Sequence, residues 1–133
     1  LYTGPSDPED GYDAPFRNAG ELAKAGVLIC FSSGLDPGVS KDLPYHAARA
    51  VAFGLARDEA IRALTINPAR IFGIDDRIGS LKVGKEADLF ITTGDPLDLR
   101  SEVRHLFING KQVDLNNWWK SLYDTWKKRP EKK

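Results

Sequence analysis

The sequence predicts an α/β protein in which helices lead into a small antiparallel sheet. Three observations predict this class: a continuous apolar run at 27–32, helical patterns between residues 44 and 73, and short glycine-bounded segments after Gly73. An apolar run of strand length is typical of a strand covered on both faces, as in a parallel sheet. The chain has 133 residues and no internal repeats, which suits one domain of ordinary size.

The helices of the first half are predicted from their ends and from their apolar spacing. Asn18 can cap the first helix and Gly26 can end it, and Pro44 can open the second. In the segments that follow, apolar side chains recur at helical spacing. After a loop rich in proline, glycine and aspartate at 1–17, the expected helices cover residues 18–26, 44–54, 57–66 and 67–73.

The second half changes to strand-like segments. Residues 78–84 and 87–94 are short and bounded by glycines. Residues 103–113 alternate on either side of Asn109-Gly110, which is the strongest two-residue signal for a β-hairpin.

A final helix is expected over 116–129, because its apolar residues fall on one helical stripe. We expect this stripe to pack on the body of the protein rather than to form an exposed ligand surface. Its members are Trp118, Trp119, Leu122, Tyr123 and Trp126.

Charge and hydropathy narrow the function classes. Basic and acidic residues number 19 each, so net charge gives no reason to expect nucleic acid or an anionic membrane as partner. No apolar run approaches the roughly 18 residues of a membrane span. We expect a soluble protein of the bacterial cytoplasm or periplasm, without a basis for choosing the compartment. Because Leu1 is not a small residue and no methionine occurs, we also expect a piece of a longer chain.

The stretch from Ala63 to Leu97, ALTINPARIFGIDDRIGSLKVGKEADLFITTGDPL, resembles the C-terminal signature of the amidohydrolase superfamily. Its imidazolonepropionase-like and prolidase-like members are the most similar, and the hairpin VRHLFINGKQVDL continues the resemblance. The matched positions are Thr65, Asn67, Pro68, Ala69, Gly73, Gly79, Ser80, Gly84, Lys85, Ala87, Asp88, Leu89, Gly94, Asp95 and Pro96.

The resemblance implies a fold and a division of the chain. It implies the last strand and helices of a (β/α)8 metallo-hydrolase barrel, followed by C-terminal strands of a small β-sandwich and a terminal helix. The apolar run 27–32 would be the eighth barrel strand. The C-terminal portion of the barrel would then cover 1–77, the sandwich strands 78–115, and the C-terminal helix and tail 116–133.

The resemblance also implies chemistry on a divalent metal, usually Zn²⁺, that activates a water. Of the family's ligands, only the aspartate after the eighth strand can be present, since the chain has two isolated histidines, His46 and His105, and no H-x-H. Asp36 is the candidate for this metal ligand and proton shuttle, with a simple turn residue in LDPG as the alternative. Ser33 is a candidate for substrate contact. We expect both histidines to be structural or solvated.

Asp88 sits in the signature at the entrance of a predicted strand, between Ala87 and Leu89. A carboxylate there can accept backbone N–H bonds, and we expect them from the glycine turn at 84–86. This favours a structural role for Asp88 over a catalytic one. Asp42 is expected to cap the helix that Pro44 opens.

The expected function is therefore the C-terminal part of an enzyme that hydrolyses amide, cyclic amide or peptide bonds. The isolated chain should bind no metal and be inactive, because most ligands of the family are missing from it. Two alternatives are a non-catalytic scaffold or binding module derived from this fold, and a split enzyme whose barrel is completed by another chain. Since 27–32 and helix 44–53 would lack neighbours, the isolated chain should self-associate. The substrate and the metal stay open.

Overall fold

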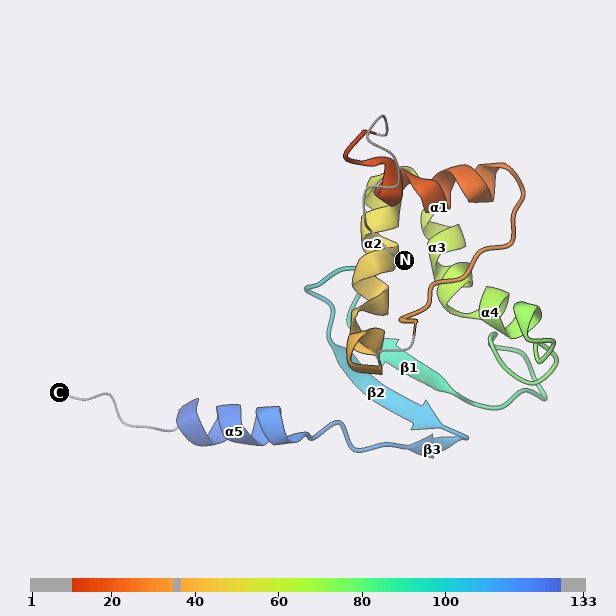
Figure 1. The fold of residues 1–133 in the computed structure, drawn as a ribbon. Coiled ribbons are helices and arrows are strands. Elements are labelled where there is room, and N and C mark those ends of the chain that lie inside the picture. The colour runs from red at the N-terminus through yellow and green to blue at the C-terminus, as the bar shows by residue number, and fades with distance from the viewer. Residues whose placement is uncertain (1–10, 35–36, 128–133) are drawn as a thin grey trace.

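The computed structural model describes residues 11–34 and 37–127, and in it a group of helices lies over a small sheet (Figure 1). The helical part comprises α1 (Ala14–Lys24), the 3-10 helix η1 (Pro37–Asp42), α2 (Leu43–Ala52), α3 (Arg57–Leu64) and α4 (Ile66–Ile71). The strands β1 (Leu89–Thr92), β2 (Val103–Ile108) and β3 (Lys111–Gln112) follow, and then helix α5 (Trp118–Lys127). The predicted α/β class with a small antiparallel sheet is confirmed.

Helix α1 begins one turn earlier than predicted. Pro15 stands in its first turn, where a ring with φ near −65° suits the helix. Asn18 consequently lies inside the helix and exposed, so its predicted capping role is wrong. Asp42 does occupy the N-cap position of α2, but its side chain makes no capping hydrogen bond. Gly26 follows the end of α1 with a φ of 79°, which confirms the predicted stop.

The core of the helical part is built mainly from alanines. Small side chains let α2 and α3 approach each other closely, and Gly20 of α1 lies directly against the backbone of Gly54 and Leu55. Phe31 is the largest member, and its burial contributes about 2 kcal/mol. The buried cluster consists of Ala19, Phe31, Ala47, Ala50, Leu55, Ala60 and Ala63.

The apolar run 27–32 is not a strand in the described structure, so that prediction is wrong for this chain. The Phe31 N–H donates to the Ala63 carbonyl at 3.2 Å, and Ile29 packs against the core, while Val27 and Leu28 stay exposed by nearly half. A strand requires a neighbouring strand for its ladder, and this run lies against helices. The apolar character of 27–32 predicted that part of this segment would be buried, but it did not predict that helices, instead of strands, would cover it.

The sheet has the order β1-β2-β3 and is antiparallel throughout. Phe90 lies opposite Leu106 in β2. Asn109 and Gly110 have φ values of 50° and 73°, and the left-handed conformation at both positions is that of a type I′ turn, so the predicted hairpin is confirmed. Residues 78–84, predicted as a strand, instead form turns and bends.

Helix α5 forms as predicted, but its predicted packing is wrong. None of its residues is buried, and Figure 1 shows it directed away from the other helices and the sheet. An apolar stripe predicts that one face of a helix packs against another surface, but it does not indicate which part of the protein, or which partner, provides that surface.

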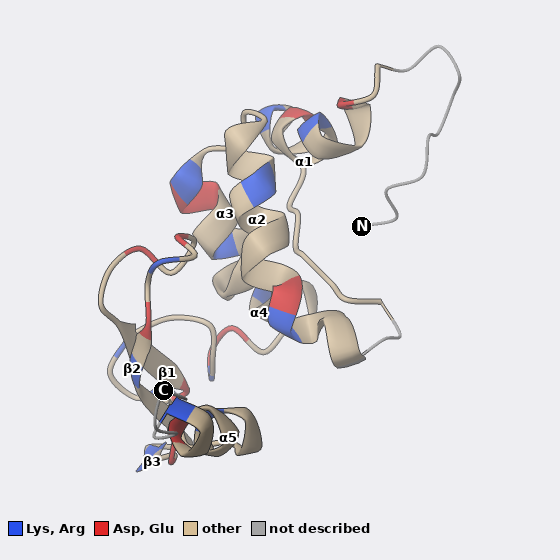
Figure 2. Cartoon of the chain, turned by 90° about the vertical axis from the view of Figure 1, so that its left-hand side faces the viewer, with Lys and Arg blue, Asp and Glu red and all other residues tan. Residues whose placement is uncertain are grey.

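Charges of both signs occur on the helices and around the sheet (Figure 2). No helix in residues 11–34 and 37–127 is long and apolar enough to span a membrane.

Candidate functional site

The candidate site lies where the segment 27–33 leaves the core and leads toward α2. Asp36, the predicted metal ligand, lies outside the described residues. Ser33 is partly buried, and its Oγ lies 3.0 Å from the Oγ of Ser40 in η1. Ser32 Oγ accepts the Gly34 N–H at 3.1 Å. Ser32 thus shapes the turn at Gly34, and Ser33 links the end of the segment to η1.

Asn67 anchors the segment 27–33, a role that the sequence did not reveal. Its side chain is 1% exposed, and its Nδ2 donates to the Ile29 carbonyl at 3.1 Å and to Glu59 Oε1 at 2.8 Å. Burying an amide requires such partners, because an unpaired one costs about 1–3 kcal/mol. The signal in the sequence was its place in the signature, directly before Pro68.

Asp88 has the expected structural role with a different partner. Its Oδ1 accepts the backbone N–H of Asn109 at 2.6 Å, instead of N–H groups of residues 84–86. The carboxylate therefore ties the start of β1 to the hairpin turn. The backbone adds a second tie, since the Gly110 N–H donates to the Ala87 carbonyl at 3.1 Å.

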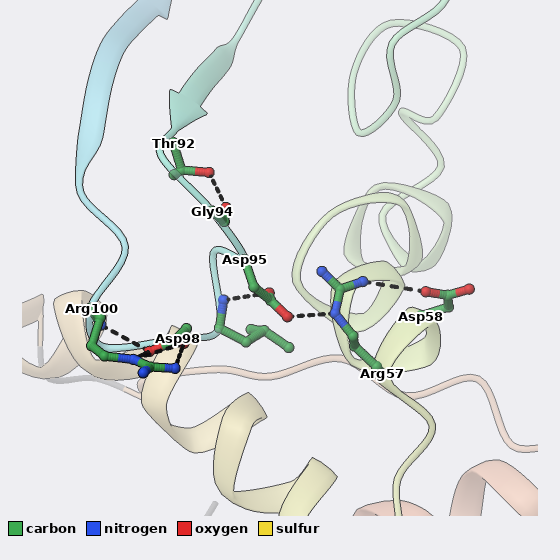
Figure 3. Close-up of polar contacts among 8 residues, drawn as sticks. Arg57, Asp58, Thr92, Gly94, Asp95, Asp98 and Arg100 are labelled. Carbon is green, nitrogen blue, oxygen red and sulfur yellow. Dashed lines mark hydrogen bonds and ion pairs between the residues drawn. The ribbon is translucent and has the colours of Figure 1, made fainter.

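An ion pair connects the helical part to the loop after β1 (Figure 3). Arg57 Nε, at the start of α3, donates to Asp95 Oδ2 at 2.6 Å, and Asp95 Oδ1 accepts the Leu97 N–H at 2.9 Å. The hydrogen bond from Arg57 lowers the pKa of Asp95 below its ordinary value. Thr92 Oγ1 donates to the Gly94 carbonyl at 2.6 Å and shapes the preceding turn.

A second ion pair closes the same loop. Arg100 Nη2 lies 2.7 Å from Asp98 Oδ2, and the Arg100 N–H donates to Asp98 Oδ1 at 2.9 Å. These bonds, led by that of the side chain, lower the pKa of Asp98 to about 2.

Side-chain contacts also hold the glycine-containing turns at residues 78–86, before β1. Lys85 Nζ donates to the carbonyls of Asp75 and Ile78, and Arg77 Nη2 lies 2.5 Å from Glu86 Oε1. The signature residues described so far therefore make structural contacts that join the helices, the loops and the sheet.

Comparison with known proteins identifies the family of the chain. The model of the Amidohydrolase family matches residues 16–113. The chain belongs to the amidohydrolase family. The resemblance inferred from the signature between Ala63 and Leu97 is confirmed.

Relatives of this amidohydrolase chain include imidazolonepropionases. That of Bacteroides thetaiotaomicron is 36% identical over 84 residues, covering 61% of this chain and 20% of that protein. That of Porphyromonas gingivalis is 38% identical over 81 residues, covering 59% and 19%. The solved structure of an amidohydrolase from Thermotoga maritima MSB8 superposes with a TM-score of 0.70 at 32% identity, covering 84% of this chain and 30% of that one. The chain spans about a fifth of the length of these curated relatives.

The two histidines of this amidohydrolase chain lie on separate elements with local partners. His46 Nδ1 in α2 lies 3.1 Å from Arg49 Nη2, and His105 Nδ1 in β2 lies 3.3 Å from Gln112 Nε2. Across residues 11–34 and 37–127, no group of three His, Cys, Asp or Glu side chains is placed to hold a metal ion. These residues therefore do not fit a complete metal centre, and any ligand role of Asp36 would be a contribution to a larger set.

Proposed function

We propose that this chain forms the C-terminal part of a metal-dependent amidohydrolase that cleaves C–N bonds in cyclic amides, open amides or peptides. The supporting observation is the family match over 16–113 together with relatives named imidazolonepropionase. In this proposal residues 1–77 belong to the barrel, 78–115 to a β-sandwich, and 116–133 form the terminal helix and tail.

The segment 27–33 forms no strand in the described structure, but it would become a barrel strand if the rest of the whole protein supplied neighbouring strands for its ladder. Asn67 and the Ala63 carbonyl hold it firmly against α3 and α4. Val27 and Leu28 remain nearly half exposed, which suits a strand whose strand neighbours lie on other parts of the protein. At the carboxyl end of such a strand, loop residues reach the reaction centre of a barrel enzyme.

Two residues of that loop carry the proposed chemistry. Asp36 would supply one carboxylate ligand and move a proton, and Ser33 would contact the substrate. When bound, a divalent metal such as Zn²⁺ lowers the pKa of a water and polarises the scissile carbonyl. The remaining ligands would come from the part of the relatives' length that this chain does not span.

The first test uses the purified chain alone. We expect less than stoichiometric zinc after dialysis and no hydrolysis of imidazolonepropionate or simple amides, because one carboxylate does not hold zinc tightly. Elemental analysis and a substrate-depletion assay measure both quantities. One tightly bound zinc per chain together with turnover would contradict the proposal.

The second test places the chain in an enzyme context. Residues 16–113 replace the corresponding segment of the Bacteroides thetaiotaomicron imidazolonepropionase, and the chimera is assayed for hydrolysis. We expect retained activity, which Asp36→Asn lowers by about 100-fold or more together with the metal content. Asp42→Asn, at the end of η1, is the matched control and should leave both unchanged.

The outcomes of the chimera separate the alternatives. A chimera with a native circular dichroism spectrum but no hydrolysis would argue against a catalytic role and for a scaffold or binding module. Retained activity with an unaffected Asp36→Asn variant would remove Asp36 from the proposed site while leaving the hydrolase assignment in place.

A further inference from the structure

Helix α5 presents an exposed aromatic surface, in which the Trp118 and Trp119 rings contact each other and Lys127 Nζ lies over the Tyr123 ring. Trp118, Trp119 and Tyr123 are 66%, 73% and 60% exposed, and the helix is directed away from the body of the chain (Figure 1). Isolated surface hydrophobics are ordinary, whereas a contiguous exposed aromatic patch marks an interaction site. We define these three residues as the α5 stripe.

The same chain carries an apolar groove between α2 and the sheet. Two adjoining hollows of about 380 Å³ and 710 Å³ meet over Tyr45, Asp98 and Leu99, which line both. Leu99 is 77% exposed at the centre of this groove, so a large apolar side chain already faces solvent there. The hollow nearer the sheet is also lined by Phe90, Leu106 and Leu115.

We propose that the α5 stripe of one copy of this chain docks into the α2–sheet groove of a second copy, and that the second copy returns the contact. This goes beyond the proposed function, because it assigns an interaction surface without involving hydrolysis. Aromatic anchors on one side of a helix entering an apolar groove are a recurrent mode of recognition. A reciprocal exchange closes into a two-fold dimer instead of a fibre.

The position of α5 favours a second copy over its own chain. Leu115, three residues before Trp118, already lies in the groove, and the helix then runs away from it (Figure 1). The α5 stripe is therefore exposed to solvent, and so is the groove next to Leu115, from which the chain leads into α5. In the proposed dimer, the helix of the second copy fills this groove.

The size of the two surfaces agrees with this pairing. At the observed exposures, three aromatic side chains offer about 400 Å² for burial on each helix. Two helices and two grooves would then bury about 1,600 Å² in total, the size of a standard stable interface. Lys127 Nζ lies over the Tyr123 ring at 5.4 Å from its centroid, and Asp98 at the groove is paired with Arg100, so area and not charge supports the pairing.

The test uses a spectroscopic property of the chain. All three of its tryptophans lie in α5, so tryptophan emission reports on this helix alone. In sedimentation and emission measurements over a dilution series, we expect a dimer in the micromolar range and a blue shift of emission that grows with the dimer fraction. A monomer with solvent-type emission at every concentration would overturn the proposal. So would a monomer whose emission is blue-shifted at every dilution, because its helix would be folded back on its own chain.

Two single variants identify the surfaces. Trp119→Ser on the stripe and Leu99→Asp in the groove should each weaken the dimer at least tenfold, and both sites are exposed enough to leave the circular dichroism spectrum unchanged. Lys120→Ser, next to the stripe but on the polar side of α5, is the control and should have little effect. If neither variant changes the dissociation constant of the dimer, another surface, such as the segment 27–32, forms it, and the proposal is contradicted.

Mixing the two variants gives the decisive measurement. Each variant retains one half of the interaction, so a mixture of Trp119→Ser and Leu99→Asp chains should form a heterodimer through one intact helix–groove contact. This heterodimer should be more stable than either variant homodimer at equal concentration, with the emission of the Leu99→Asp chain shifted to the blue. If the mixture stays as monomeric as its components, helix–groove exchange is wrong.

Discussion

Asn67 shows how a single polar residue can organise this chain. It occupies a core position, yet its two hydrogen bonds connect the segment 27–33, through Ile29, with Glu59 of α3. The signature drew attention to Asn67 only as one of many matched positions. Its role became evident from its burial and its partners, because both depend on residues distant in the sequence.

Replacing Asn67 by Ala should destabilise the fold by about 2–3 kcal/mol, because the Ile29 carbonyl and the Glu59 carboxylate both lose their donor. Urea denaturation monitored by circular dichroism measures the free energy of unfolding. Asn18→Ala, on the exposed surface of α1, is the control and should change it by less than about 0.5 kcal/mol. Equal stability of the two variants would show that the Asn67 bonds contribute nothing.

At the scale of elements, the loop 93–101 joins the sheet to the helices through carboxylates. Asp95 pairs with Arg57 of α3, and Asp98 pairs with Arg100 in the loop itself. Both pairs are exposed to solvent, so each contributes modestly and is screened by salt. Their importance lies in fixing the orientation of the loop between two kinds of secondary structure.

These pairs predict a pH dependence of stability. The folded-state pKa of Asp98 is about 2, below its ordinary 3.8, and that of Asp95 is also lowered. Stability from a lowered carboxyl pKa is present above the unfolded value and is lost as pH falls toward the folded one. The stability advantage of the native chain over Asp98→Asn should therefore persist at pH 7 and disappear between about pH 4 and pH 2.

Urea titrations of both chains across this range measure the effect. Asp124→Asn, on α5, serves as the control variant, and its difference from the native chain should not follow the same course. A difference for Asp98→Asn that grows on acidification would reverse the sign and contradict the assignment.

For the whole molecule, the sequence predicted what is decided locally and missed what depends on distant partners. The Asn109-Gly110 turn and the stop at Gly26 were correct, because backbone conformation at those residues is nearly self-determined. The run 27–32 and the α5 stripe were correctly recognised as apolar, but the strand neighbours expected for the first and the packing expected for the second were wrong. Of the candidate site, Ser33 is placed in a loop contact with Ser40, and the role of Asp36 stays a prediction.

The uneven distribution of the core predicts uneven local stability. Helices α2 and α3 contribute Ala47, Ala50, Ala60 and Ala63 to the buried cluster, whereas no residue of β1, β2 or β3 is buried. Hydrogen exchange should therefore be slower for the amides of α2 and α3 than for those of the sheet, because the sheet opens at lower free energy. Mass spectrometry of exchanged peptides measures this order, and slower exchange in the strands would contradict it.

The hairpin turn has a chemical consequence over long storage. An asparagine followed by glycine loses ammonia when the glycine nitrogen attacks the side-chain amide carbon, and in this fold the Gly110 nitrogen is engaged with the Ala87 carbonyl. Deamidation at Asn109 should thus proceed mainly from molecules whose sheet has come apart. The rate of deamidation in ageing samples would then report how often the sheet opens. Asp88→Ala removes the carboxylate that accepts the Asn109 N–H, so this variant should deamidate faster.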